Sequence, residues 1–139
     1  MKILIDTNVI VDNLALRDEY EESLKLLQLC ENGFLKGVIT TVTVMDVLYI
    51  MRKHLSLDEV RDSVQILLHI VDLVPILKSD IDTALAGDFS DLEDAVQASC
   101  ARRIRADYIV TRNVKDFNGS SVPAVIPAGM LKILAPANR

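Results

Sequence analysis

Isolated aspartates among apolar segments are the residues of this chain best placed to do chemistry. Asp6 directly follows the apolar run Ile3-Leu4-Ile5, and Asp46 lies between apolar neighbours in a segment of helical periodicity. Asp91 and Asp94 lie three residues apart, so they can share one face of a helix. An acid on the inward side of a helix is costly unless it is paired or bound to metal. These acids therefore predict a site at which carboxylates gather.

A divalent cation is the expected companion of such a site. Carboxylates that converge without matching basic groups repel one another, and a cation relieves this repulsion. Their hard oxygen ligands favour Mg²⁺ or Mn²⁺. Asp116 is a further candidate ligand, although Arg112 and Lys115 are close enough in sequence to pair with it.

Helix capping is the competing explanation for some of these acids. Asp6 and Asp91 both stand where the N-cap of a helix is expected. Capping does not explain Asp46, which follows several helical residues. Nor does it explain Asp94, which lies inside the helix that Asp91 would cap. We therefore interpret the set as a site, while each cap position keeps its structural alternative.

Length, composition and charge indicate what kind of protein carries this site. The chain has 139 residues, of which 50% are hydrophobic and 25% charged, and this predicts a single domain over residues 1–139. A net charge of -5 argues against a general electrostatic grip on nucleic acid or anionic membrane, but it permits a local basic rim. The first apolar stretch is cut off by Asp6, and no apolar run approaches the ~20 residues that span a bilayer. We expect a cytoplasmic protein.

Other reactive side chains are poor candidates for a site. Cys30 and Cys100 fall inside apolar helical patterns and are expected to be reduced core thiols. His54 lies at a helix end and His69 beside apolar residues, so neither is a favoured ligand. The five glycines are scattered and form no phosphate-binding loop, which disfavours nucleotide binding of the Walker or Rossmann kind.

The elements that must position the acids are short apolar strands alternating with amphipathic helices. Strands are predicted at residues 2–5, 37–40, 70–74, 108–110 and 124–126. Helices are predicted at residues 7–16, 19–31, 57–68, 79–86, 91–105 and 127–131, and another is capped by Thr41 or Thr43. This alternation predicts an α/β fold with a parallel sheet covered on both faces. Sites in such folds lie beyond the carboxyl ends of the strands.

Three motifs in order resemble the PIN domain, and in particular the small VapC-like toxin type. They are Asp6-Thr7-Asn8-Val9, the segment from Asp88 to Ala95, and the segment from Thr111 to Phe117. The resemblance covers nearly the whole chain. It implies a three-layer α/β/α sandwich with a central parallel sheet of four to five strands. It also implies a metal-dependent ribonuclease, usually a homodimer that is inhibited by a cognate antitoxin.

The resemblance assigns roles to the acids by position. It implies a catalytic and metal-binding set of Asp6, Asp46, Asp94 and Asp116, with Asp91 as a further metal ligand or as the alternative to Asp116. Two departures from the family pattern stand out. The family commonly has Glu where this chain has the shorter Asp46, and its fourth acid often occupies the position of Asn113.

Water activated by Mg²⁺ or Mn²⁺ is the expected nucleophile, because no His, Lys or Cys is placed to act as nucleophile or base. The family implies hydrolysis that leaves 5′-phosphate and 3′-hydroxyl ends. Groups expected to orient a ligand or phosphate are Thr7, Asn8, Thr111 and Asn113. Arg112 and Lys115 are candidates for contact with the RNA backbone, and solvated surface charge is the equal alternative. Single-stranded or looped RNA is the expected substrate, because a small domain reaches a splayed strand more readily than an A-form groove.

Two other functions stay open at this point. A phosphatase of the haloacid dehalogenase type would use Asp6 as its nucleophile, but its Asp-x-Asp motif lacks the second acid because Asn8 stands there. A non-catalytic degenerate PIN or receiver-like module would use the acidic pocket only to dock a basic partner. Titration of Mn²⁺ against wild type and Asp6→Asn separates the nuclease from the binding module.

Overall fold

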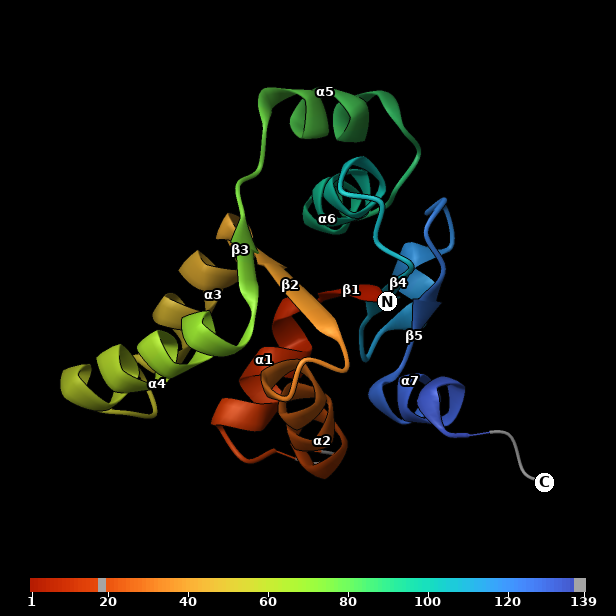
Figure 1. The fold of residues 1–139 in the computed structure, drawn as a ribbon. Coiled ribbons are helices and arrows are strands. Elements are labelled where there is room, and N and C mark those ends of the chain that lie inside the picture. The colour runs from red at the N-terminus through yellow and green to blue at the C-terminus, as the bar shows by residue number, and fades with distance from the viewer. Residues whose placement is uncertain (18–19, 137–139) are drawn as a thin grey trace.

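The fold is built on a sheet of parallel strands, shown in a computed structural model that describes residues 1–17 and 20–136 (Figure 1). The strands are β1 (Lys2–Ile5), β2 (Lys36–Thr40), β3 (Asp72–Val74), β4 (Tyr108–Val110) and β5 (Ala124–Val125). They form one five-stranded sheet in the order β3-β2-β1-β4-β5, and each neighbouring pair is parallel. The predicted α/β fold with a central parallel sheet is confirmed.

Helices cover both faces of this sheet (Figure 1). They are α1 (Thr7–Leu14), α2 (Tyr20–Glu31), α3 (Thr41–Met51), α4 (Leu57–Ile70), α5 (Lys78–Ala86), α6 (Leu92–Arg103) and α7 (Pro127–Leu134), with the 3₁₀ helix η1 (Val114–Phe117). Side chains of β1 alternate between the faces, as the pleat of a strand requires. Ile3 and Ile5 join one core cluster, and Leu4 joins the other. The central strand is therefore buried on both sides, which explains its unbroken apolar sequence.

Close packing between α2 and β2 depends on one glycine. A Cβ at Gly37 would lie 2.7 Å from Cys30 Sγ and 3.0 Å from Val71 Cγ1. Only a residue without a side chain lets the helix approach this closely.

Cys30 and Cys100 are both free and buried, which confirms the prediction that they are reduced core thiols.

Several helix and strand ends differ from the predicted ones. Neither Thr41 nor Thr43 caps α3, because Thr40 is the N-cap and its Oγ accepts from the amide of Thr43 at 3.3 Å. Ile70 ends α4 instead of starting a strand, since the amide of Val71 still bonds to Leu67 O at 3.0 Å. The backbone becomes extended at Val71, and the strand β3 begins at Asp72.

Other boundaries were also set by local geometry. Helix α6 ends at Arg103 and not at Arg105, where the backbone adopts a φ of 58°. Helix η1 was not predicted, since its four residues are too short for a periodic signal. The capping box of Ser56 and Glu59 on α4 is confirmed. The predicted start of α2 at Glu19 lies outside the described residues.

No helix in the described ranges is both long enough and apolar enough to span a membrane.

Candidate functional site

Asp6 stands at the carboxyl end of β1 and is held there by hydrogen bonds on both carboxylate oxygens. Its Oδ1 accepts from the amide of Thr7 at 2.9 Å, which makes Asp6 the N-cap of α1. Its Oδ2 accepts from Thr111 Oγ1 at 2.9 Å and from Asn8 Nδ2 at 3.1 Å. Asp6 is only 7% exposed. The cap and the site interpretations therefore describe the same residue, because one oxygen caps the helix while the other faces side chains from elsewhere.

Asn8 fixes the loop after β4 against α1. Its Oδ1 accepts from the amide of Arg112 at 3.1 Å, and its Nδ2 lies 3.4 Å from Thr111 Oγ1. The amide of Asn113 donates to Thr111 Oγ1 at 3.1 Å. Of the four predicted orienting groups, Asn8, Thr111 and, through its amide, Thr7 meet at Asp6. The side chain of Asn113 is exposed and makes no capping bond to η1.

Gln97 is a buried member of the site that the sequence analysis missed. Its Oε1 accepts from Thr40 Oγ1 at 2.7 Å, and its Nε2 donates to Thr43 Oγ1 at 2.9 Å. Thr43 Oγ1 in turn lies 2.9 Å from Thr7 Oγ1. This network links α6 to the end of β2 and the start of α1. A signal was present in the sequence, because Gln97 is a polar residue on the small, apolar face of a helix.

Burial and polar contacts oppose each other at Asp6. Burial raises the pKa of Asp6, and the negative charge of Asp116 raises it further. Hydrogen bonds from Thr111, Thr7 and Gln97 act in the other direction and lower that pKa. The net pKa is raised, so three donors do not fully replace the water that this carboxylate has lost.

Asp94 lies within reach of several other carboxylates. Its pKa is raised to about 7, chiefly by burial and then by the negative charges of Asp6, Asp91 and Asp116. Asp91 lies nearby as the N-cap of α6, where its Oδ1 accepts from the amide of Asp94 at 3.1 Å. The structure thus brings four of the predicted acids, from β1, α6 and η1, into one electrostatic field.

Asp46 contacts a different acid, Glu93, which was not predicted. Asp46 is half-buried on α3, and its hydrogen bond to Glu93 is the main reason that the pKa of Glu93 is raised to about 8. Burial and the charges of Asp46, Asp91 and Asp94 add to the shift. Glu93 therefore joins Asp46 to the site. Its place in the Asp88-to-Ala95 motif was the available signal.

Neither predicted basic group neutralises these acids. Arg112 Nη1 pairs with Asp12 at 2.6 and 2.8 Å, and Asp12 is a buried residue of α1 that the sequence analysis did not single out. Lys115 is exposed. Within residues 1–17 and 20–136, no Lys or Arg forms an ion pair with Asp6, Asp94 or Asp116. The expected pairing of Asp116 with Arg112 or Lys115 is thus not formed.

The donor chemistry of the site fits a hard divalent cation. Only carboxylate, hydroxyl and amide groups are present, and burial, followed by neighbouring charge, raises the pKa values of Asp6 and Asp94. In the part of the chain that is described, however, no three His, Cys, Asp or Glu side chains come together as a metal-binding group. The assignment of individual metal ligands stays a prediction.

Comparisons with known proteins agree with this architecture. The family model for the PIN domain matches residues 2–115. No curated protein sequence matches the chain.

Among solved structures, a toxin–antitoxin complex from Klebsiella pneumoniae is 23% identical, with a TM-score of 0.70, covering 90% of this chain and 97% of that one. VapBC2 from Rickettsia felis, bound to a DNA fragment from its promoter, is 19% identical, with a TM-score of 0.68 and coverage of 91% and 98%. Mycobacterium tuberculosis VapC20, described as a toxin that cleaves the sarcin–ricin loop, is 11% identical, with a TM-score of 0.60 and coverage of 77% and 86%. At these identities the likeness shows a shared fold.

Proposed function

Because the chain belongs to the PIN domain family, we propose that it is a metal-dependent endoribonuclease and the cytoplasmic toxin of a toxin–antitoxin pair. The observation that supports this proposal is the set of carboxylates around Asp6 and Asp94, for which the described part of the chain shows no ion pair with Lys or Arg. An acidic site without a neutralising Lys or Arg is suited to a cation. The VapC20 structure, described as that of a toxin that cleaves the sarcin–ricin loop, supports RNA as the substrate class.

The carboxylates have distinct duties in this proposal. Asp6, Asp94 and Asp116 would hold Mg²⁺ or Mn²⁺, Asp91 would complete the set, and Asp46 would act together with Glu93. When bound, such an ion supplies Lewis acidity toward the phosphate and lowers the pKa of water, which would be the nucleophile.

The neutral side chains of the site keep these acids in place. Thr111 and Asn8 orient the Oδ2 of Asp6 by donating hydrogen bonds to it. Gln97 ties α6, which carries Asp94, to Thr40 and Thr43. Thr7 and Asn113 would orient the phosphate, with Asn113 exposed on the loop after β4.

Single-stranded or looped RNA is the proposed substrate, cut to give 5′-phosphate and 3′-hydroxyl ends. Lys115 would contact the RNA backbone, since it is exposed beside Asp116. Arg112 is less available for contact with RNA because it pairs with Asp12, although 41% of its side chain is exposed. A net charge of -5 argues against a general electrostatic attraction to nucleic acid, and a bound cation would offset repulsion at the site.

The proposed partners are a cognate antitoxin and a second copy of this chain. The Klebsiella pneumoniae structure is a toxin–antitoxin complex, which supports the first. For the second, α3 and α4 expose large apolar side chains, among them Met45, Tyr49 and Ile66. Surfaces of this kind are common at homodimer interfaces. Light scattering of the purified chain tests the homodimer directly.

Cleavage of a mixed RNA pool, with Mn²⁺ or with a chelator and followed by mapping of the ends, tests the proposed activity. Wild type should cleave only with metal, and Asp6→Asn or Asp94→Asn should lose about 10²-fold or more of the rate with the fold intact. Asp62→Asn, an exposed carboxylate of α4, is the matched control and should keep full activity. Full activity in both site variants contradicts the proposal. If Mn²⁺ neither binds nor stabilises wild type more than Asp6→Asn, a non-catalytic binding module is the better assignment.

A further inference from the structure

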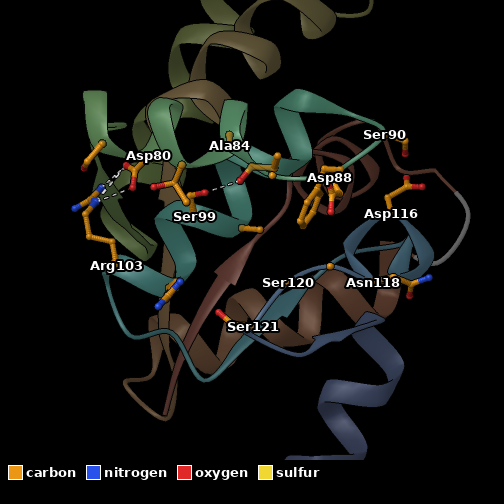
Figure 2. Close-up of a pocket in the computed structure, with 18 of the residues that line it drawn as sticks. Asp80, Ala84, Asp88, Ser90, Ser99, Arg103, Asp116, Asn118, Ser120 and Ser121 are labelled. Atoms are coloured by element: carbon orange, nitrogen blue, oxygen red, sulfur yellow. Dashed lines mark hydrogen bonds and ion pairs between the residues drawn. The ribbon is translucent and has the colours of Figure 1, made fainter.

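A cavity of about 850 Å³ lies beside the carboxylate site, between α5, α6 and the loop at residues 118–121 (Figure 2). Its volume falls within the ~300–1,000 Å³ that is usual for sites of small ligands. Asp116 and Lys115 line it, so the cavity adjoins the acids described above. Figure 2 shows Asp88, Ser90 and Asp116 gathered at one end, and Asp80 with Arg103 at the other.

The cavity has fixed walls. Arg103 Nε and Nη2 donate to Asp80 at 2.9–3.1 Å, which ties α6 to α5 at the far end. Ser120 Oγ donates to Val122 O at 2.7 Å and accepts from the amide of Val122 at 3.1 Å, which shapes the loop. A Cβ at Gly119 would lie 2.9 Å from the Phe89 ring, so glycine lets this loop meet the segment before α6. The hollow is therefore formed before any ligand binds.

The lining is rich in hydroxyl groups and balanced in charge. Hydroxyl side chains come from Ser79, Thr83, Ser90, Ser99, Ser120 and Ser121. The carboxylate of Asp80 is neutralised by Arg103. Arg102 and Lys115 also line the cavity, are exposed, and form no ion pair within the described part of the chain. Arg102 and Lys115 offer two cations, which the carboxylates of Asp88 and Asp116 balance, so the lining is neutral overall and rich in hydrogen-bonding groups.

These features suit a ribonucleotide better than a peptide. Phosphate oxygens accept hydrogen bonds from hydroxyl and basic side chains, and the ribose 2′-hydroxyl both donates and accepts. A docked peptide helix instead needs apolar pockets for its anchoring side chains. Here the apolar lining is mostly small, from Ala84, Ala95 and Ala98. Hydrogen bonding and size favour a segment of RNA, and Arg102 and Lys115 supply cations for its phosphates.

We propose that this cavity binds a nucleotide of the RNA strand that flanks the phosphodiester being cut. The strand would run from the acids near Asp116 into the hollow between α5 and α6. This proposal rests on the proposed nuclease function, because that function places the scissile phosphate at the acids. It adds a second contact region, which begins at Asp116 and extends away from Asp6 and Asp94 toward Asp80 and Arg103, where the substrate strand is held.

Filling the cavity should weaken binding of the substrate without altering the acids. Thr83→Trp and Ser121→Trp each place a large ring on an exposed position, one on α5 and one on the loop. We expect each to raise KM for a cleavable RNA by about tenfold or more while kcat changes little. Leu85→Trp is the matched control: it is exposed on the same helix but does not line the cavity, and it should leave both constants unchanged. Arg102→Ala, which cannot distort the fold by bulk, should also raise KM.

Shortening the RNA provides the decisive comparison. Removing the nucleotide that occupies the cavity should raise the KM of wild type by a similar factor, and it should have little further effect on Thr83→Trp or Ser121→Trp. Equal losses on long and short RNA, or wild-type behaviour of both Trp variants and Arg102→Ala, would overturn the proposal. In that case a segment of a protein partner becomes the better occupant of the cavity.

Binding of labelled RNA in the presence of chelator separates this proposal from the nuclease assignment. If wild type binds RNA but cleaves none with any metal, while both Trp variants bind more weakly than Leu85→Trp, the cavity site stands and the nuclease assignment fails. If wild type cleaves with Mn²⁺ and all three Trp variants match it, the nuclease assignment stands and the cavity site fails. Circular dichroism of each variant confirms that the fold is retained.

Discussion

At the residue scale, the position of Asp6 in the sequence was enough to predict its place in the site. Because Asp6 directly follows the buried strand β1, it lies at the carboxyl edge of the sheet. The contacts of Asp6 with Asn8 and Thr111 follow, because the ends of β1 and β4 are neighbours in the sheet. Strand ends are local features of the sequence, so these three residues could be predicted. The partner of Asp12 lies in the loop after β4, and that of Asp46 lies on another helix, so the spacing along the chain did not predict either pairing.

Thr111→Val tests whether orientation of Asp6 matters for metal binding. Valine keeps the shape of threonine but removes the hydroxyl that donates to Asp6 Oδ2 at 2.9 Å. We expect Mn²⁺ affinity to fall about 10–100-fold, which is typical when a partner of a metal ligand is lost. Isothermal titration calorimetry measures the change. Thr83→Val, an exposed threonine of α5, should bind Mn²⁺ as wild type does, and an unchanged affinity in Thr111→Val would mean that this hydroxyl does not orient a ligand.

At the element scale, most helices and strands followed from periodicity and capping signals, while their ends depended on contacts. Strand β1 and the start of α4 were predicted correctly because apolar runs and the Ser56 capping box are local. The N-cap of α3 was wrong by one residue. Thr40 is still the last residue of β2, yet its side chain already bonds to Gln97 and to the first turn of α3. Only the packing of α6 against this strand end decides which of the neighbouring threonines acts as the cap.

Gln97→Leu tests whether this network holds α6 in place. The substitution leaves the buried hydroxyls of Thr40 and Thr43 without the amide that contacts both. Each hydroxyl keeps one other partner, the amide of Thr43 for Thr40 and Thr7 Oγ1 for Thr43. Loss of a bond to a buried polar group costs about 1–3 kcal/mol, so the free energy of unfolding should fall by about that amount. Urea denaturation measures it. Gln65→Leu on α4, where the side chain is exposed, is the matched control and should change stability little. Equal stability of both variants would show that the network contributes nothing to the fold.

At the scale of the whole molecule, the sequence predicted that acids gather at one site but not all the groups that surround them. The spacing of Asp91 and Asp94 predicts a local pair, and the order of the strands brings in acids from elsewhere in the chain. The fold adds Asp6 from β1 and Asp116 from η1 to that pair. The same fold joins Asp46 to Glu93. Repulsion between these charges should lower the free energy of unfolding of the metal-free protein, and thermal melting at different pH values can measure this effect.

The metal-free protein should lose stability as pH rises from 6 to 8. A folded-state pKa above the unfolded value means that the protonated acid is favoured by folding, so its stabilising contribution is complete below the unfolded pKa and is lost as pH passes the folded value. For Asp94 this window runs from its ordinary pKa of 3.8 to about 7, and for Glu93 from 4.5 to about 8. The exposed cap Glu59 has a lowered pKa and acts oppositely, but its effect is confined to more acidic pH.

Comparison with Asp94→Asn measures the contribution of Asp94 together with its effect on the pKa of Glu93. Without metal, the variant should melt at a higher temperature than wild type at pH 8, and the difference should shrink toward pH 6, where more of Asp94 is protonated. Adding Mn²⁺ at pH 8 should stabilise wild type and leave Asp94→Asn nearly unchanged, because a bound cation requires the ionised acid. Asp62→Asn should follow wild type throughout. A variant that melts below wild type at pH 8 without metal would mean that Asp94 serves the structure of α6 and is not strained by its neighbours.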